Sequence, residues 1–150
     1  MAMTKDEIDQ LLQKDGIGTL ALNGRDGYPV AVPIGYVYEE GRIYVMAGNL
    51  RKRIVARDPR VTFNVYADTL GDACWVSISG TAQLTKEKGL ERVRGLHIHS
   101  GLSEAETDRM LKPLEGSEQE LLEITPEYMR SWKMKAPSFV RRTPVSTWLS

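Results

Sequence analysis

Short runs of β-branched and aromatic residues, separated by glycine-containing turns, fill the first part of the chain. Residues 17–23 (IGTLALN), 28–39 (YPVAVPIGYVYE) and 42–48 (RIYVMAG) form such runs, and GRDG and EEG separate them. Connections this short join antiparallel neighbours, because a parallel crossover needs about a dozen residues or more. This part of the chain is therefore expected to form an antiparallel β-sheet.

Three later runs extend the sheet, namely 61–67 (VTFNVYA), 74–85 (CWVSISGTAQLT) and 120–134 (ELLEITPEYMRSWKM). Pro126 in the last run requires an edge position or a bulge, because proline donates no ladder hydrogen bond. Closing six short strands into a barrel removes their exposed edges. We therefore predict a mainly β fold, a six-stranded antiparallel barrel with peripheral helices. Its interior is filled by its own side chains, so a sizeable ligand binds outside it.

Helices are expected before this sheet and within its connections. Thr4 and Glu7 match a capping box, and the apolar spacing that follows predicts a helix over 5–14. Apolar residues three and four apart predict a second helix from Lys86 to about His99, and the acidic segment 101–119 is expected to be partly helical.

A chain of 150 residues has room for one core, so we expect a single domain over 1–150. Its expected parts are an N-terminal helix in 1–16, the barrel with inserted helices in 17–134 and a C-terminal tail in 135–150.

The charge balance and the cysteine usage exclude several classes of protein. Lysine plus arginine and aspartate plus glutamate both number 20, which argues against a surface coated in positive charge for indiscriminate nucleic-acid binding. The amino end has no export signal, and no segment reaches the ~20 apolar residues of a membrane span. The single cysteine, Cys74, forms no internal disulfide, so a cytoplasmic setting is expected.

Two residue types that often carry chemistry, cysteine and histidine, are given ordinary roles here. Cys74 lies beside a tryptophan in an expected strand, which is typical of a buried, inert thiol. His97 and His99 are interpreted as surface or interface histidines. No Cys/His group has zinc-ligand spacing, so no metal site is predicted.

Positive charge is concentrated in residues 48–63, GNLRKRIVARDPRVTF. Asn49 is a good N-cap, and no helix breaker occurs before Asp58, so a short helix is predicted. At about 100° per residue, Arg51 falls between Ile54 and Val55 and points toward the body of the protein. An arginine beside the unpaired N–H groups of a first helical turn suits a phosphate monoester, and Lys52 would add charge at the rim.

Taken in order, residues 17–48, the basic helix, RDPRVTF and VSISGTAQLT resemble the pyridoxamine 5′-phosphate oxidase-like, FMN-binding split-barrel family. The resemblance runs from about Ile17 to Thr85 and continues through LLEITPEYMRSW. It implies a homodimer of split barrels, with two FMN molecules in the clefts between the subunits.

The resemblance also implies a set of cofactor-binding residues. Arg51 falls where the family has a phosphate-binding lysine or arginine, whereas Leu50 stands where a second arginine is frequent. The implied contacts are the backbone of Val32, Pro33, Ile34 and Gly35 along the flavin ring, Met46 and Ala47 over it, and aromatic residues of the partner subunit, for which Trp75 and Trp132 are the candidates. The helix itself adds Asn49 and Lys52 as expected contacts near the phosphate. Independently, a glycine at position 35 would let a flat ring approach the main chain.

The leading interpretation is a flavin-dependent oxidoreductase in which FMN carries the electrons, so that no catalytic side chain is needed. One alternative is a reductase using a deazaflavin cofactor, with Arg51, Lys52 and Arg53 facing its phosphate and acidic tail. Further alternatives are a non-catalytic flavin or haem binding protein and a nucleic-acid binder that uses the basic helix. Pyridoxamine phosphate oxidase activity itself needs a second phosphate site, for which Arg141 and Arg142 are the late candidates.

Overall fold

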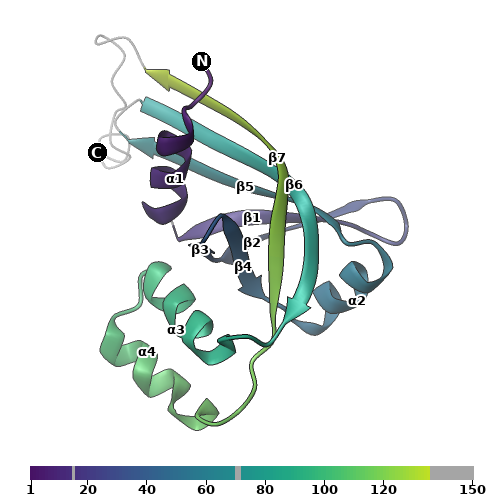
Figure 1. The fold of residues 1–150 in the computed structure, drawn as a ribbon, viewed down its shortest axis with the longest axis vertical. Coiled ribbons are helices and arrows are strands. Elements are labelled where there is room, and N and C mark those ends of the chain that lie inside the picture. The colour runs from purple at the N-terminus through teal and green to yellow at the C-terminus, as the bar shows by residue number, and fades with distance from the viewer. Residues whose placement is uncertain (15, 70–71, 136–150) are drawn as a thin grey trace, which may run out of the picture.

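One curled antiparallel sheet forms the body of the protein, and the four α-helices of the described residues lie outside it (Figure 1). The computed structural model describes residues 1–14, 16–69 and 72–135. The elements are α1 (Lys5–Lys14), β1 (Ile17–Asn23), β2 (Pro29–Gly35), β3 (Val37–Glu39), β4 (Arg42–Met46), α2 (Asn49–Arg57), β5 (Arg60–Thr69), β6 (Asp72–Thr85), α3 (Gly89–His99), α4 (Glu104–Leu111), the 3-10 turn η1 (Lys112–Leu114) and β7 (Leu121–Lys135). The mainly β split-barrel fold is confirmed.

The described residues contain seven strands rather than the expected six, in the order β2-β1-β5-β6-β7-β4-β3. The expected strand over 28–39 is divided at Tyr36, where the chain leaves β1 and goes on to pair with β4. The side chain of Tyr36 is fully buried, and its hydroxyl donates to the carbonyl of Leu12 at 2.9 Å. Because β2 and β3 are consecutive yet lie at opposite edges of the sheet order, this break closes the curled sheet into a split barrel.

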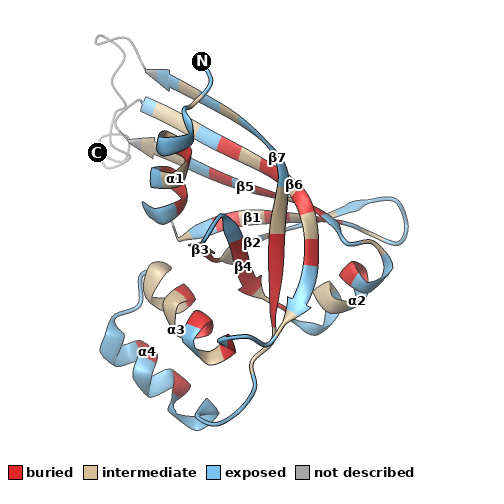
Figure 2. Cartoon of the chain, viewed as in Figure 1, coloured by how far each residue is buried: buried red, intermediate tan, exposed pale blue. Residues whose placement is uncertain are grey.

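The barrel interior is packed with the chain's own side chains, as predicted (Figure 2). The fully buried side chains of the sheet include Leu20, Phe63, Val65, Val76, Ile78 and Ile124. Helix α1 adds Ile8, Leu11 and Leu12 to the same cluster. A large ligand would therefore have to bind on the outer surfaces.

Pro126 lies at a bulge between β6 and β7, as predicted. Ser79 pairs with Tyr128 whereas Gly80 pairs with Pro126, so that Glu127 is the extra residue on β7. The pairing of β7 with β4 covers Leu121–Ile124 and has ended before the proline. The bulge therefore accommodates proline, which has no N–H to donate to the ladder.

Helix α3 differs slightly from its predicted limits, whereas α1 matches them. The capping box forms, because the Thr4 N–H donates to Glu7 Oε1 at 3.0 Å and the Glu7 N–H donates to Thr4 Oγ1 at 3.2 Å. Helix α3 begins at Gly89, three residues after the predicted start, because Lys88 takes a left-handed conformation with φ of 49°. Segment 101–119 is partly helical, as predicted. In the described residues, no helix is both long enough and apolar enough to cross a membrane.

The ion pair between Glu7 and Lys133 joins α1 to the end of β7. Lys133 Nζ lies 2.7 Å from Glu7 Oε2. The Lys133 ammonium, followed by the Thr4 backbone N–H, lowers the pKa of Glu7 from 4.5 to about 2. Since the unfolded chain has the ordinary pKa, this pair stabilises the fold fully above pH 4.5, and the contribution is lost as the pH falls toward 2.

Replacing Lys133 with methionine is therefore expected to lower stability at neutral pH and to make stability less sensitive to acid. The urea midpoints of the two proteins should differ at pH 7 and converge as the pH falls through the range in which Glu7 is protonated. Lys112→Met, at an exposed position on η1, should leave the acid dependence unchanged. Parallel pH profiles for the Lys133 variant and the parent would contradict this assignment.

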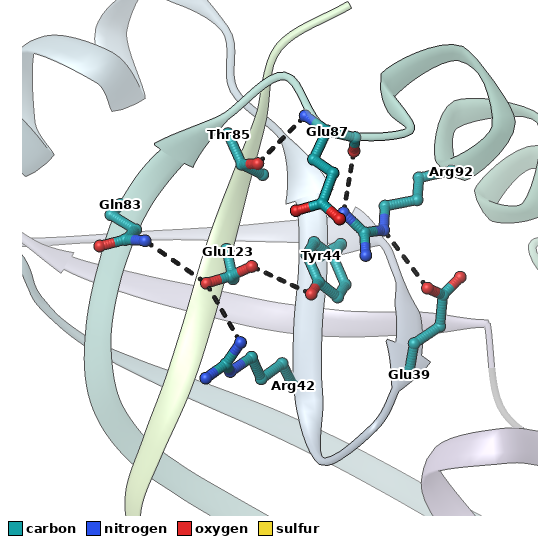
Figure 3. Close-up of polar contacts among 8 residues, drawn as sticks. All are labelled: Glu39, Arg42, Tyr44, Gln83, Thr85, Glu87, Arg92 and Glu123. Atoms are coloured by element: carbon teal, nitrogen blue, oxygen red, sulfur yellow. Dashed lines mark hydrogen bonds and ion pairs between the residues drawn. The ribbon is translucent and has the colours of Figure 1, made fainter.

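A polar network on the face of β4 that packs against α3 connects the sheet to this helix (Figure 3). The Tyr44 hydroxyl donates to Glu123 Oε2 at 3.0 Å, and Arg92 stacks 3.8 Å from the centre of the Tyr44 ring. Arg92 also donates to the Glu87 carbonyl at 2.9 Å and pairs with Glu39 at 3.3 Å. Arg92 and Glu123 are both buried, with 7% and 8% of their surfaces exposed. This network fixes β4, whose last residue, Met46, leads into the candidate site.

Candidate functional site

Helix α2 follows β4 closely, and its first turn has no side-chain cap. Gly48 is the N-cap with φ of 65°, so Asn49 is the first helical residue and the prediction of Asn49 as N-cap is wrong. The positive φ of Gly48 lets the chain turn from strand to helix one residue earlier than a side-chain cap would. Among the described residues, no side chain caps this turn by a hydrogen bond, and no acidic residue lies in the turn. Its backbone N–H groups therefore remain available to an anion.

The side chain of Arg51 folds back from α2 toward the end of β4. Its Nε donates to the carbonyl of Met46 at 3.1 Å, and the side chain is half-buried. The guanidinium lies against Gly48, since a Cβ placed at Gly48 would lie 2.7 Å from Arg51 Nη2. This is the orientation toward the protein body that the helical wheel predicted. None of the described residues accepts a hydrogen bond from the two Nη groups of Arg51, so these groups can bind two oxygens of an anion.

The other basic residues of α2 point in different directions from Arg51. Lys52 Nζ pairs with Glu120 Oε1 at 3.0 Å, so any anion at the rim would share this ammonium with a carboxylate. Arg53 is exposed and faces a groove of about 720 Å³ between α2 and the β1–β2 turn. This groove is lined by Gly24, Arg25, Asp26, Val30, Leu50, Arg53, Ile54 and Arg57.

Of the groove arginines, the sequence analysis named Arg53 in the deazaflavin alternative but missed Arg25 and Arg57, although helical spacing points to Arg57. Positions 50, 53, 54 and 57 share one face of a helix at spacings of three and four residues. Arg57 is held there, because its Nη2 donates to the Asn23 carbonyl at 2.8 Å. Arg25 comes from the β1–β2 turn, and its proximity depends on a hairpin packing that the sequence does not specify.

The four predicted residues of β2 lie on an edge strand that pairs with β1. Val32 and Ile34 pack partly against the core, whereas Pro33 is exposed on the outer face. The role expected of Gly35 is wrong in one respect, because the space beside it is filled by α3. A Cβ at Gly35 would lie 2.5 Å from Ser100 Oγ and 3.1 Å from Leu96 Cδ2. Glycine therefore permits close packing of α3 on β2.

Met46 and Ala47 lie at the junction of β4 and α2, near Arg51. The Met46 side chain is half-buried and packs on the cluster beneath α3. Ala47 is 2% exposed and belongs to the main core, so its side chain covers no ring and the expectation for it is wrong. Only the backbone of Ala47 remains as a contact for a ligand.

Trp75 and Trp132 are cross-strand partners on β6 and β7. They are 38% and 49% exposed, which is unusual for tryptophan and leaves both indoles on the outer face of the sheet. The start of β6 and the end of β7 lie far from α2, at the end of the sheet where α1 packs (Figure 1). One chain therefore does not bring these tryptophans to Arg51.

The other candidate residues are placed as follows. Cys74 is half-buried, so the prediction of a buried thiol is wrong. The ring nitrogens of His99 lie 2.8 Å from the carbonyl oxygens of Tyr36 and Gln13, so His99 joins α1, α3 and the β2–β3 break rather than lying at the surface. Among the residues that the structure describes, no three His, Cys, Asp or Glu side chains gather to hold a metal. Arg141 and Arg142 lie outside the described residues.

Comparisons with solved structures show that this architecture is shared. The conserved hypothetical protein Rv2991 from Mycobacterium tuberculosis is 25% identical, with a TM-score of 0.71 over 93% of this chain and 94% of that chain. A FAD-binding protein from Mesorhizobium loti is 17% identical, with a TM-score of 0.64 over 89% and 95% of the two chains. An F420 reductase is 15% identical, with a TM-score of 0.62 over 81% and 94%.

Sequence comparisons give one match and one absence. No curated protein matches the chain. The family model for pyridoxamine 5′-phosphate oxidase matches residues 4–133, which include the whole sheet apart from the last two residues of β7, and α2 with Arg51. The chain therefore belongs to the pyridoxamine 5′-phosphate oxidase family.

Proposed function

We propose that the protein is a flavin-dependent oxidoreductase that binds FMN in a cleft between two copies of the chain. The observation that carries the proposal is the geometry of Arg51. Its guanidinium is oriented by the Met46 carbonyl and lies beside the uncapped first turn of α2. This donor set suits a phosphate dianion, since a guanidinium grips two oxygens while backbone N–H groups bind a third.

The chain's own residues would hold and orient the flavin. Arg51 and the first turn of α2, Asn49 included, would bind the phosphate, with Lys52 at the rim. The edge strand β2, with Val32, Pro33, Ile34 and Gly35, would lie along the ring, and Met46 would border it. The bound flavin would supply hydride and electron transfer. No side chain of the chain is assigned a proton-transfer role.

A second copy of the chain would complete the site. Trp75 and Trp132 lie far from Arg51 within one chain, yet they are exposed as a pair on the outer sheet face. Large exposed aromatic side chains are typical of interfaces. In a two-fold dimer the same surface occurs on both subunits, so each subunit would offer its tryptophans to the flavin held by the other.

Mixing two variants tests both the cofactor and the shared site. Arg51→Ala and Trp132→Ala would each impair flavin binding as homodimers. In a dimer assembled from one subunit of each kind, one of the two sites is intact. A statistical mixture should therefore recover flavin at about a quarter of the sites. The measurements are flavin absorbance per chain and the mass of the extracted cofactor.

The controls are the two unmixed variants and sedimentation of the parent as a dimer. Recovery absent from the mixture, with dimers present, would show that Arg51 and Trp132 do not share a site. Purified protein that takes up no flavin at all would refute the proposal itself.

A second candidate is a reductase that uses a deazaflavin cofactor. The observation in its favour is the groove beside α2, where Arg25, Arg53 and Arg57 outnumber the single carboxylate of Asp26. An acidic cofactor tail that extends past Arg51 would find this positive charge. Mass analysis of the cofactor bound in a host that makes both compounds separates the two candidates.

A further inference from the structure

The outer face of the sheet carries two adjacent rows of side chains across β5, β6 and β7. The cross-strand register sets Tyr66, Trp75 and Trp132 in one row and Asn64, Ser77 and Arg130 in the next. Successive side chains of a strand alternate between faces, so these two rows point the same way, out of the barrel. The residues between them, such as Val65 and Val76, are fully buried in the core.

A shallow, open hollow of about 410 Å³ lies between these rows. It is lined by Asn64, Val65, Tyr66, Trp75, Ser77 and Arg130. None of the lining side chains is acidic. Arg130 is exposed. Within the described part of the chain its guanidinium contacts the ring of Tyr128, whose centre lies 5.6 Å from the guanidinium carbon. The hollow therefore combines aromatic walls with one positive charge that no carboxylate of the described chain neutralises.

We propose that this hollow binds a small aromatic anion, such as an aryl carboxylate. The ring would stack on Trp75 and Tyr66, because aromatic faces attract one another beyond simple burial of area. The anionic group would reach Arg130, whose planar guanidinium matches a carboxylate in two parallel hydrogen bonds. Alternate residues along a strand lie roughly 6.5–7 Å apart, which sets the distance from the ring to the charge.

Two further groups make the site selective for such a ligand. Asn64 and Ser77 lie in the row of Arg130 and offer an amide and a hydroxyl to the same end of the ligand. A neutral ring would use the aromatic wall alone, and a cationic ring would be repelled by Arg130. The volume suits a molecule of one or two rings, as in other small-molecule sites.

The placement of this ligand in a reaction rests on the proposed function. Trp75 borders the hollow and is also a residue offered to the flavin of the partner subunit. A ring bound in the hollow would therefore lie beside the flavin, in the place of a substrate. The residues that line the hollow come from one chain, so ligand binding there does not require the flavin.

Calorimetric titration with 2-naphthoate and with neutral 2-naphthamide tests the inference. The parent protein, with and without saturating FMN, should bind the carboxylate about tenfold more tightly than the amide. Arg130→Met should lower the affinity for 2-naphthoate to that for 2-naphthamide and leave the amide affinity unchanged. Arg130→Lys should retain part of the preference, because the charge remains and the bidentate geometry is lost. Arg109→Met, at an exposed arginine on α4, is the matched control.

Equal affinities for the two probes in the parent, or an unchanged preference in Arg130→Met, would overturn the site. Loss of 2-naphthoate binding on saturation with FMN would overturn its placement beside the flavin. The failure of the proposed function is distinguishable from the failure of this inference. A chain that prefers 2-naphthoate but takes up no flavin would support the ligand site and refute the proposed function. A flavoprotein that shows no preference for 2-naphthoate would refute the ligand site and support the proposed function.

Discussion

Replacing Arg51 with alanine is expected to weaken FMN binding by about 1.5–3 kcal/mol, which is roughly a 10- to 150-fold rise in Kd. The Met46 carbonyl holds the Arg51 guanidinium beside Gly48 at the start of α2, so its bound geometry needs little rearrangement. The first turn of α2 would still bind the phosphate, which limits the loss. Quenching of flavin fluorescence on titration with apoprotein measures the two constants.

Two variants make this result specific. Arg53→Ala removes an arginine from the same helix that faces the neighbouring groove, so FMN affinity should change little. Arg51→Lys keeps the positive charge but lacks the planar pair of donors, so its affinity for FMN should lie between that of Arg51→Ala and that of the parent. Unchanged FMN affinity in Arg51→Ala, with an unchanged melting temperature, would sink the assignment of the phosphate site. A large loss in Arg53→Ala would instead favour a cofactor with a longer anionic tail.

The alternating pattern of the sequence was enough to predict the sheet, because a side-chain period of two and short glycine turns leave few alternatives. It did not reveal the break at Tyr36. A run from 28 to 39 reads as one strand, and only the tertiary pairing of β2 with β1 and of β3 with β4 divides it. The bulge at Pro126 was predictable, since proline constrains the ladder locally.

The candidate site was predictable where it depends on one helix. The wheel of α2 gave the direction of Arg51, because helical geometry fixes it. Ala47 and Gly35 were misjudged, because their surroundings come from the core and from α3, which are distant in sequence. Asn49 was misjudged as the cap because the conformation of Gly48 depends on how β4 ends. The hollow at Arg130 required the β5–β6–β7 register, which no local pattern supplies.

The network around Tyr44 explains why β4 holds its position beneath α3, and it predicts the largest loss of stability. Arg92→Ala is expected to lower the free energy of unfolding by about 2–4 kcal/mol, with a fall in melting temperature of roughly 5–12 °C. The change removes the partner of the Glu87 carbonyl, the cation over the Tyr44 ring and the packing of a buried apolar stem (Figure 3). Urea unfolding followed by circular dichroism measures the loss.

Arg94 on the same helix provides the matched comparison. Its ion pair with Asp108 is shorter, at 2.7 Å against 3.3 Å for Arg92 with Glu39, but its side chain is 41% exposed. If contact distance decided stability, Arg94→Ala would cost more than Arg92→Ala. Because water solvates exposed charges almost as well as a partner does, burial decides instead, and Arg94→Ala should change the unfolding midpoint far less. Similar losses in the two variants would mean that α3 depends on its surface pairs rather than on the buried network beneath it.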